Sequence, residues 1–70
     1  MSKYDVLWQH VRTRDESTLK LTFDEIAEIL GFQIVHSFLN YKKELAGYGY
    51  RVEKISLKER WIIFRKIEIL

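Results

Sequence analysis

The order in which the hydrophobic period changes along these 70 residues constrains the fold more than any other feature. Some segments repeat apolar side chains every three or four positions, as helices do, whereas others alternate or are rich in β-branched and aromatic residues, as strands are. The expected elements are helices over residues 4–12, 23–30 and 35–46, and strands over residues 19–21, 50–57 and 60–67. The pattern predicts one small domain, residues 1–70, in the order helix, strand, helix, helix, strand, strand.

A start signal and a stop signal frame residues 23–30. Thr22 and Glu25 have the spacing of a capping box, in which the threonine hydroxyl accepts the third helical N–H and the glutamate accepts the N–H of the threonine. Gly31 suits the left-handed conformation that ends many helices. The side chains predicted to face the core from this helix are those of Phe23, Ile26, Ala27 and Leu30.

The other two predicted helices are also amphipathic. Ser2 can cap the first, whose apolar face carries Tyr4, Leu7, Trp8 and Val11. In the third, a turn of about 100° per residue directs inward Phe38, Leu39, Tyr41, Leu45 and Ala46. The opposite side carries His36, Asn40, Lys43 and Glu44, with Ser37 at its edge. The third helix is therefore expected to present a polar side to solvent.

The last two segments predict a β-hairpin around the charged turn Lys58-Glu59. Their alternation is imperfect because Ile62 and Ile63 are adjacent, which indicates a β-bulge or a sheet partly covered on both faces. We expect residues 19–21 to pair with this hairpin, giving an α+β fold of three helices and a small three-stranded antiparallel sheet. The side chains expected to meet in its core are those of Leu7, Trp8, Phe23, Ile26, Leu30, Phe38, Leu45, Ile55 and Phe64.

The composition restricts where such a protein works. The chain has no cysteine, so neither a disulfide nor a thiolate metal site is expected. Its longest apolar runs, such as residues 61–64, are too short to span a bilayer, and its first residues have no apolar signal-peptide core. We therefore expect a cytoplasmic protein without a membrane-spanning segment.

Charge is distributed unevenly along the chain. The net charge is only +2, but residues 1–35 hold four basic and six acidic side chains, whereas residues 36–70 hold eight basic and four acidic ones. A basic half is typical of domains that face a polyanion. It is equally compatible with an ordinary soluble surface, on which lysine and arginine are scattered.

The middle of the chain carries a motif. The segment Leu21-Thr-Phe-Asp-Glu-Ile-Ala-Glu-Ile-Leu-Gly31 is followed by a tight connection and by a helix that ends Tyr41-Lys-Lys-Glu-Leu-Ala-Gly-Tyr-Gly49. From about Leu19 to Phe64 the chain resembles winged helix-turn-helix regulators of bacteria, in which a T-x-x-E-I-A-x-x-L-G helix precedes the recognition helix. The resemblance implies a transcription-regulator-like protein that binds double-stranded DNA, with the third helix in the major groove and the hairpin as the wing.

A second resemblance covers nearly the whole chain. The opening Tyr4-Asp5-x-Leu7-Trp8 and the segment Leu21-Thr-Phe-x-Glu-Ile-x-x-Ile-Leu-Gly31 are similar to those of a family of short bacterial and mobile-element proteins of unknown function. This resemblance implies no activity. Two features depart from the winged helix-turn-helix regulators: the wing at residues 57–60 is very short, and the exposed side of the third helix has no arginine, the commonest base-reading residue.

The polar side of the third helix and the hairpin tip supply the candidate DNA-binding residues. Asn40 can pair bidentately with adenine, and His36 and Ser37 can reach base edges or phosphates from the start of the helix. Lys43, Lys58 and Arg60 can neutralise phosphates. The alternative interpretation is that all six are simply the solvated side of an amphipathic helix and a charged turn.

Enzymatic and metal chemistry have little support in the sequence. His10 and His36 are the only histidines, and neither has cysteines or paired carboxylates at ligand spacing, so we expect no metal, no cofactor, no small-molecule substrate and no catalytic residues. The competing function is a protein-interaction or homodimerisation module of the same fold. Five aromatic residues could form an exposed patch for a partner protein or for single-stranded nucleic acid, or could fill the core instead: Trp8, Tyr41, Tyr48, Tyr50 and Trp61.

Overall fold

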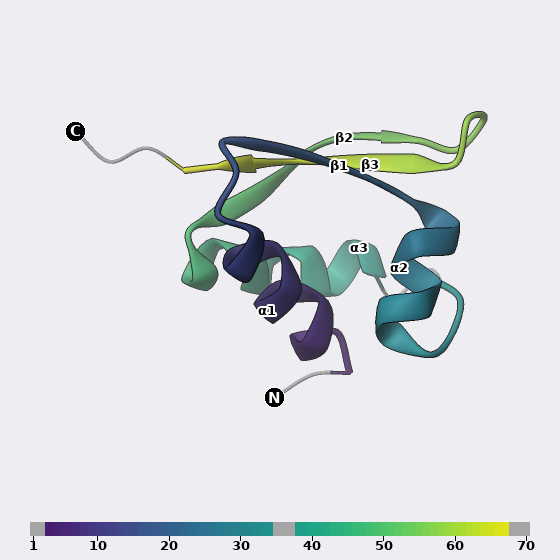
Figure 1. Cartoon of the computed structure of the whole chain (residues 1–70), viewed down its shortest axis with the longest axis horizontal. Helices are drawn as coiled ribbons and strands as arrows, with labels where there is room; N and C mark the ends of the chain where they lie inside the picture. The colour runs from purple at the N-terminus through teal and green to yellow at the C-terminus, as the bar shows by residue number, and fades with distance from the viewer. Residues whose placement is uncertain (1–2, 35–37, 68–70) are drawn as a thin grey trace.

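The computed structural model describes residues 3–34 and 38–67 (Figure 1). Its elements follow the predicted order and confirm the predicted α+β class with three helices and a three-stranded antiparallel sheet. They are α1 (Asp5–Arg14), β1 (Thr18–Thr22), α2 (Phe23–Leu30), α3 (Phe38–Tyr41) with its continuation as the 3₁₀ helix η1 (Lys42–Tyr48), β2 (Tyr50–Ser56) and β3 (Trp61–Lys66). The helix α1 ends two residues later than predicted, and its predicted cap Ser2 lies outside the described residues.

The strand β3 lies at the centre of the sheet, in the order β1-β3-β2, and is antiparallel to both neighbours. The predicted bulge is in β2, where the register shifts between Val52 and Lys54 and leaves Glu53 as the extra residue. The helices that the structure describes all lie against one face of the sheet (Figure 1). The molecule therefore has two layers, and the second face of the sheet is left open.

The core lies between the sheet and the helices. Its buried side chains come from every element and are Tyr4, Leu7, Trp8, Val11, Leu19, Leu21, Ile26, Phe38, Leu45, Tyr50, Ile62 and Phe64. Six of the nine predicted core residues are among them. The other three, Phe23, Leu30 and Ile55, are only half-buried and pack against the edge of this cluster.

The predicted capping box holds the start of α2. The Thr22 hydroxyl accepts a hydrogen bond from the Glu25 N–H at 3.1 Å, and the Glu25 carboxylate accepts one from the Thr22 N–H at 2.8 Å. The bond from the Thr22 N–H to the carboxylate, followed by a contribution from the Thr22 side chain, stabilises the charged carboxylate and lowers the pKa of Glu25. Gly31 ends the helix with a φ of 83°, as predicted, and its N–H bonds to the Ala27 carbonyl.

The third helix differs from its prediction. After four α-helical residues it continues as a 3₁₀ helix, which has three residues per turn, so that positions three apart share a side. Lys42, Leu45 and Tyr48 accordingly face the core, with Leu45 fully buried. Ala46, which the α-helical spacing placed inside, is exposed. Leu39 was also predicted inside and is 52% exposed.

Polar contacts join the helix α1 to the 3₁₀ helix η1 near the start of η1, at Glu44, and at its last residue, Tyr48. The Trp8 Nε1–H donates to the Glu44 carboxylate at 3.2 Å, and the Tyr48 hydroxyl donates to Asp5. The Arg12 guanidinium lies 5.5 Å from the centroid of the Tyr48 ring. The hydrogen bond from Tyr48 to Asp5, with some loss of hydration, raises the pKa of the tyrosine hydroxyl.

Candidate nucleic-acid interface

The third helix exposes two of the predicted DNA-binding side chains. Asn40 and Lys43 are both exposed, as the prediction requires. Asn40 lies in the short α-helical part, whereas Lys43 lies in the 3₁₀ part. Their relative direction therefore differs from that of an α-helix, since each residue turns the chain by about 120° instead of 100°. His36 and Ser37, the other two candidates on this helix, lie outside the described residues.

The hairpin turn spans residues 57–60 and is wider than the predicted Lys58-Glu59. It is closed by a hydrogen bond from the Arg60 N–H to the Ser56 carbonyl at 2.8 Å, and the Ser56 hydroxyl accepts one from the Glu59 N–H. Arg60 adopts a left-handed conformation, with a φ of 62°. The side chains of Lys58 and Arg60 are exposed, so both predicted wing cations point into solvent.

Arg60 is already engaged with the start of α2. Its carbonyl accepts the Phe23 N–H at 2.9 Å, and its guanidinium lies 3.9 Å from an Asp24 oxygen and 5.8 Å from the centroid of the Phe23 ring. A phosphate would have to compete with that carboxylate. Lys58 has no carboxylate within ion-pair distance in the described part of the chain, so its ammonium is the more accessible of the two charges.

A pocket of about 600 Å³ brings the third helix and the hairpin turn together. The residues that line it are all apolar: Phe23, Ile34, Phe38, Leu39, Ile55, Leu57 and Ile62. Leu39 and Leu57 are the most exposed of these, and they directly precede Asn40 and Lys58 in the sequence. The two predicted DNA-binding elements therefore meet at one place, but the surface between them is apolar rather than basic.

This pocket was not predicted from the sequence. Leu39 was expected inside the core, and Leu57, which is 79% exposed, was expected only as part of the short wing. The sequence signal for an exposed apolar surface was Leu57, a leucine directly beside the charged turn Lys58-Glu59. Phe23 and Ile55 are only half-buried because they line the pocket rather than the closed core.

The five aromatic residues do not form a single patch. Trp8 and Tyr50 are buried, as core filling requires, and Tyr48 and Trp61 are half-buried. Only Tyr41 reaches the exposed class, at 37%, and its ring still contacts that of Tyr4 at a centroid distance of 5.5 Å. Core filling therefore accounts for two of the five, and Trp61 lies on the open face of the sheet.

Among residues 3–34 and 38–67, no group of three histidine, aspartate or glutamate side chains is placed to hold a metal ion. The helix α1 has ten residues, about half of what a bilayer span needs, and no other helix in the described ranges is a candidate span. No protein-family model, curated protein or solved structure matches this chain.

Proposed function

We propose that this domain binds double-stranded DNA in the manner of a winged helix-turn-helix, as a transcription-regulator-like protein of the cytoplasm. The observation that carries the proposal is the meeting of α3 and the hairpin turn at one pocket, where the exposed Asn40 and Lys58 directly follow the lining residues Leu39 and Leu57. A helix beside a hairpin tip is the arrangement in which one element enters the major groove and the other reaches the flanking backbone.

The exposed side chains have different roles in the proposed DNA recognition. Asn40 offers the bidentate amide that pairs with adenine, so it reads sequence. Lys43, Lys58 and Arg60 contact phosphates, which contributes affinity without sequence preference. His36 and Ser37 complete the proposed set at the start of the third helix. A site with so few cations binds weakly as a monomer, so a homodimer or a second module belongs to the proposal.

Titration with duplex DNA tests this function. A labelled random duplex is followed by fluorescence anisotropy at about 50 mM and about 200 mM salt, the range over which phosphate contacts lose most of their strength. The variant Lys43→Gln/Lys58→Gln/Arg60→Gln is expected to lose affinity and to flatten the salt slope by about 2.7, since each phosphate contact contributes about 0.9. Asn40→Ala is expected to reduce sequence preference by about 1–3 kcal/mol.

A matched control removes the same charge from another surface. The variant Lys3→Gln/Arg14→Gln/Lys66→Gln changes three exposed cations outside the proposed interface and should bind duplex DNA as the wild type does. Absence of duplex binding by the wild type at the lower salt would contradict the proposal. Equal binding by the wild type and the interface variant would contradict it as well.

One observation favours the alternative, a protein-interaction or homodimerisation module. The apolar pocket opens between two exposed leucines, Leu39 and Leu57, and exposed apolar surface of this kind is typical of protein contacts. Sedimentation velocity over a range of concentrations separates the two functions. A dimer that forms with rising concentration, is lost in Leu39→Ser/Leu57→Ser and ignores DNA would favour this module over DNA binding.

A further inference from the structure

The open face of the sheet places an aromatic ring between two positive charges. Alternation along the strands directs Lys20 of β1, Lys54 of β2 and Trp61 of β3 away from the helices, whereas Leu21 and Ile62 beside them are buried. Lys20 and Lys54 both pair with Ile63 of the central strand, so they lie on either side of β3, two positions along from Trp61 on the same face. No helix in the described part of the chain covers this face (Figure 1).

Both lysine ammonium groups lie over the Trp61 ring. The Nζ atoms of Lys20 and Lys54 are 4.8 Å and 5.8 Å from its centroid. Neither lysine has a carboxylate within ion-pair distance among the described residues, and a cation–π contact at an exposed site is weak, so both charges remain available to an anion. The Trp61 Nε1–H is buried and meets no acceptor in the same part of the chain, so no hydrogen bond within the fold explains a tryptophan here.

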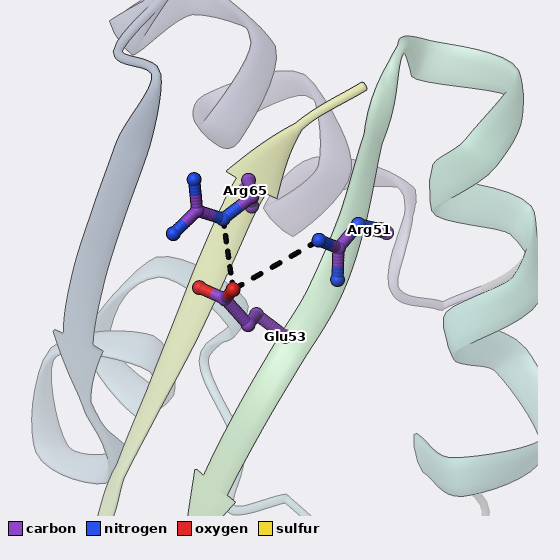
Figure 2. A network of polar contacts seen from close by, with 3 residues as sticks. All are labelled: Arg51, Glu53 and Arg65. Atoms are coloured by element: carbon purple, nitrogen blue, oxygen red, sulfur yellow. Dashed lines mark hydrogen bonds and ion pairs between the residues drawn. The ribbon is translucent and has the colours of Figure 1, made fainter. Parts of the chain in front are cut away.

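Two arginines extend the positive charge along the same face. Arg51 and Arg65 pair across β2 and β3, and the carboxylate of the bulge residue Glu53 lies between them (Figure 2). A Glu53 oxygen is 2.8 Å from Arg65 Nε and 3.8 Å from an Arg51 nitrogen. Glu53 therefore neutralises part of this pair, while the two lysines keep their full charge.

We propose that this face of the sheet binds single-stranded nucleic acid, with Trp61 stacking on a base and the lysine and arginine side chains contacting phosphates. A single strand offers the flat face of a base and a phosphate at the same time, which matches a ring flanked by cations. A duplex hides the faces of its bases, and an acidic peptide has none to offer. The proposal does not depend on the duplex site, because the third helix lies on the other side of the sheet.

When a single strand binds, the ammonium groups of Lys20 and Lys54 leave the Trp61 ring and contact phosphates instead. Their long side chains carry the ammonium groups away from Trp61, which frees the ring for a base and places the charges along the sugar–phosphate backbone. Glu53 opposes this binding because it shares both arginines. Its replacement by glutamine should therefore strengthen binding, whereas most exposed substitutions on a basic face weaken it.

The test compares single strands and a duplex of equal length by fluorescence anisotropy at low salt. The probes are labelled oligo(dT) and oligo(U) of about 12 nucleotides, close to the site size of one small domain, and a matched random duplex. Lys20→Gln/Lys54→Gln is expected to bind the single strands about tenfold more weakly and to reduce the salt slope by about 1.4, since each phosphate contributes about 0.7. Glu53→Gln is expected to bind them more tightly. Binding of both oligo(dT) and oligo(U) indicates backbone and stacking contacts, and binding of oligo(U) alone assigns the face to RNA.

Variants at the ring separate stacking from charge. Trp61→Ala should weaken single-strand binding by at least about fivefold, whereas Trp61→Phe keeps a stacking ring and most of the affinity. Circular dichroism checks that each variant is folded. If Trp61→Ala does not fold, Lys20→Gln/Lys54→Gln still tests the proposal. Arg12→Gln/Arg14→Gln removes the same charge from α1 and should bind as the wild type does.

Three results would overturn the proposal. The first is no single-strand binding by the wild type, and the second is equal binding by the wild type and Lys20→Gln/Lys54→Gln. The third is loss of duplex and single-strand binding together in the lysine variant, because that would assign the face to backbone contacts with any nucleic acid. Loss of duplex binding alone in the Lys43, Lys58 and Arg60 variant would leave this inference untouched and would bear only on the third helix.

Discussion

Thr22 is at once the last residue of β1 and the N-cap of α2. Its backbone is extended, with a ψ of 161°, so that it pairs with Trp61 in the sheet, while its side chain closes the first turn of the helix. One residue thus fixes the angle between the sheet and α2. Glu25 completes the arrangement from inside the helix, since its carboxylate bonds back to the Thr22 N–H.

Removal of this cap has an effect that can be measured. Thr22→Ala is expected to destabilise the domain by about 1 kcal/mol, since a helix loses the acceptor for an N-terminal N–H. Chemical denaturation compares it with Thr18→Ala, an exposed threonine of the same strand that caps nothing and should change stability by less than about 0.5 kcal/mol. An equal loss of stability in Thr22→Ala and Thr18→Ala would mean that the loss comes from the lower strand propensity of alanine and not from the missing cap.

The pH dependence of the same cap has a definite sign. Hydrogen bonds from Thr22 lower the pKa of Glu25 in the folded state, so its stabilising contribution is complete above the pKa of the unfolded chain. That contribution is lost as the pH falls through the lower folded-state pKa, below about pH 4.5. Thermal unfolding between pH 3 and pH 6 should show a smaller loss of stability on acidification in Glu25→Gln than in the wild type.

At the scale of elements, the contact between α1 and η1 positions the third helix. The chain from Phe38 to Tyr48 contains only four α-helical residues, and short helices are not stable by themselves. Tertiary contacts therefore hold it in place, among them the hydrogen bonds from Trp8 to Glu44 and from Tyr48 to Asp5. Changes in α1 are expected to reach the proposed DNA-binding helix through these contacts.

Tyr48→Phe tests this coupling. The hydrogen bond to Asp5 raises the pKa of Tyr48 when the domain is folded, so its contribution to stability is present below the unfolded-state pKa and is lost as the pH rises through the folded-state pKa. The wild type should therefore lose stability above about pH 10, and Tyr48→Phe should lose less over the same range. Parallel alkaline profiles from thermal unfolding would contradict this role of the hydroxyl.

The elements also differ in how far the sequence predicts them. For α2, the cap and Gly31 are local signals, and both are confirmed. Of the four apolar side chains predicted to face the core, Ile26 is buried, whereas Phe23, Ala27 and Leu30 are half-buried. For the third helix, the change from α to 3₁₀ geometry after Tyr41 has no local marker, and its packing against α1 through Leu45 and Tyr48 is a tertiary effect. The α-helical spacing placed Phe38 and Leu45 correctly and misplaced Ala46 for this reason. Leu39 and Tyr41, also predicted inside, lie in the α-helical part and are exposed, Leu39 because it lines the pocket.

At the scale of the whole molecule, a single core between the two layers holds every element. A domain of this size has a stability of only a few kcal/mol, so one buried side chain accounts for much of it. Phe38 is 2% exposed and contacts both Tyr4 and Trp8, with ring centroids 5.5 Å and 5.7 Å away. It joins the third helix to α1.

Phe38→Ala is expected to cost about 3–5 kcal/mol and to unfold a large part of the population at room temperature. Leu39→Ala, at the adjacent and 52% exposed position, should cost less than about 1 kcal/mol. Circular dichroism and urea denaturation report both. Similar losses at the two positions would place Leu39 in the core and would remove the pocket as an exposed surface.

The surfaces of the molecule were harder to predict than its core. Lys20, Lys54 and Trp61 are far apart in the sequence, and they become neighbours only through the register of β1 and β2 on β3. The bulge at Glu53 sets that register for β2, and alternation alone indicated a bulge without its position. The charge imbalance between the two halves of the chain likewise did not reveal that Lys20, from the acidic half, joins the basic face.

The central position of β3 has a consequence during biosynthesis. The ribosome makes β1 and β2 before β3, yet in the sheet each of them pairs only with β3. Until Lys66 has been translated, both strands lack their hydrogen-bonding partner, and Leu19, Leu21 and Tyr50 have no completed layer on which to pack. The nascent chain therefore carries unpaired strand edges and apolar side chains until β3 has left the ribosome, and this is the stage at which chaperones would protect it.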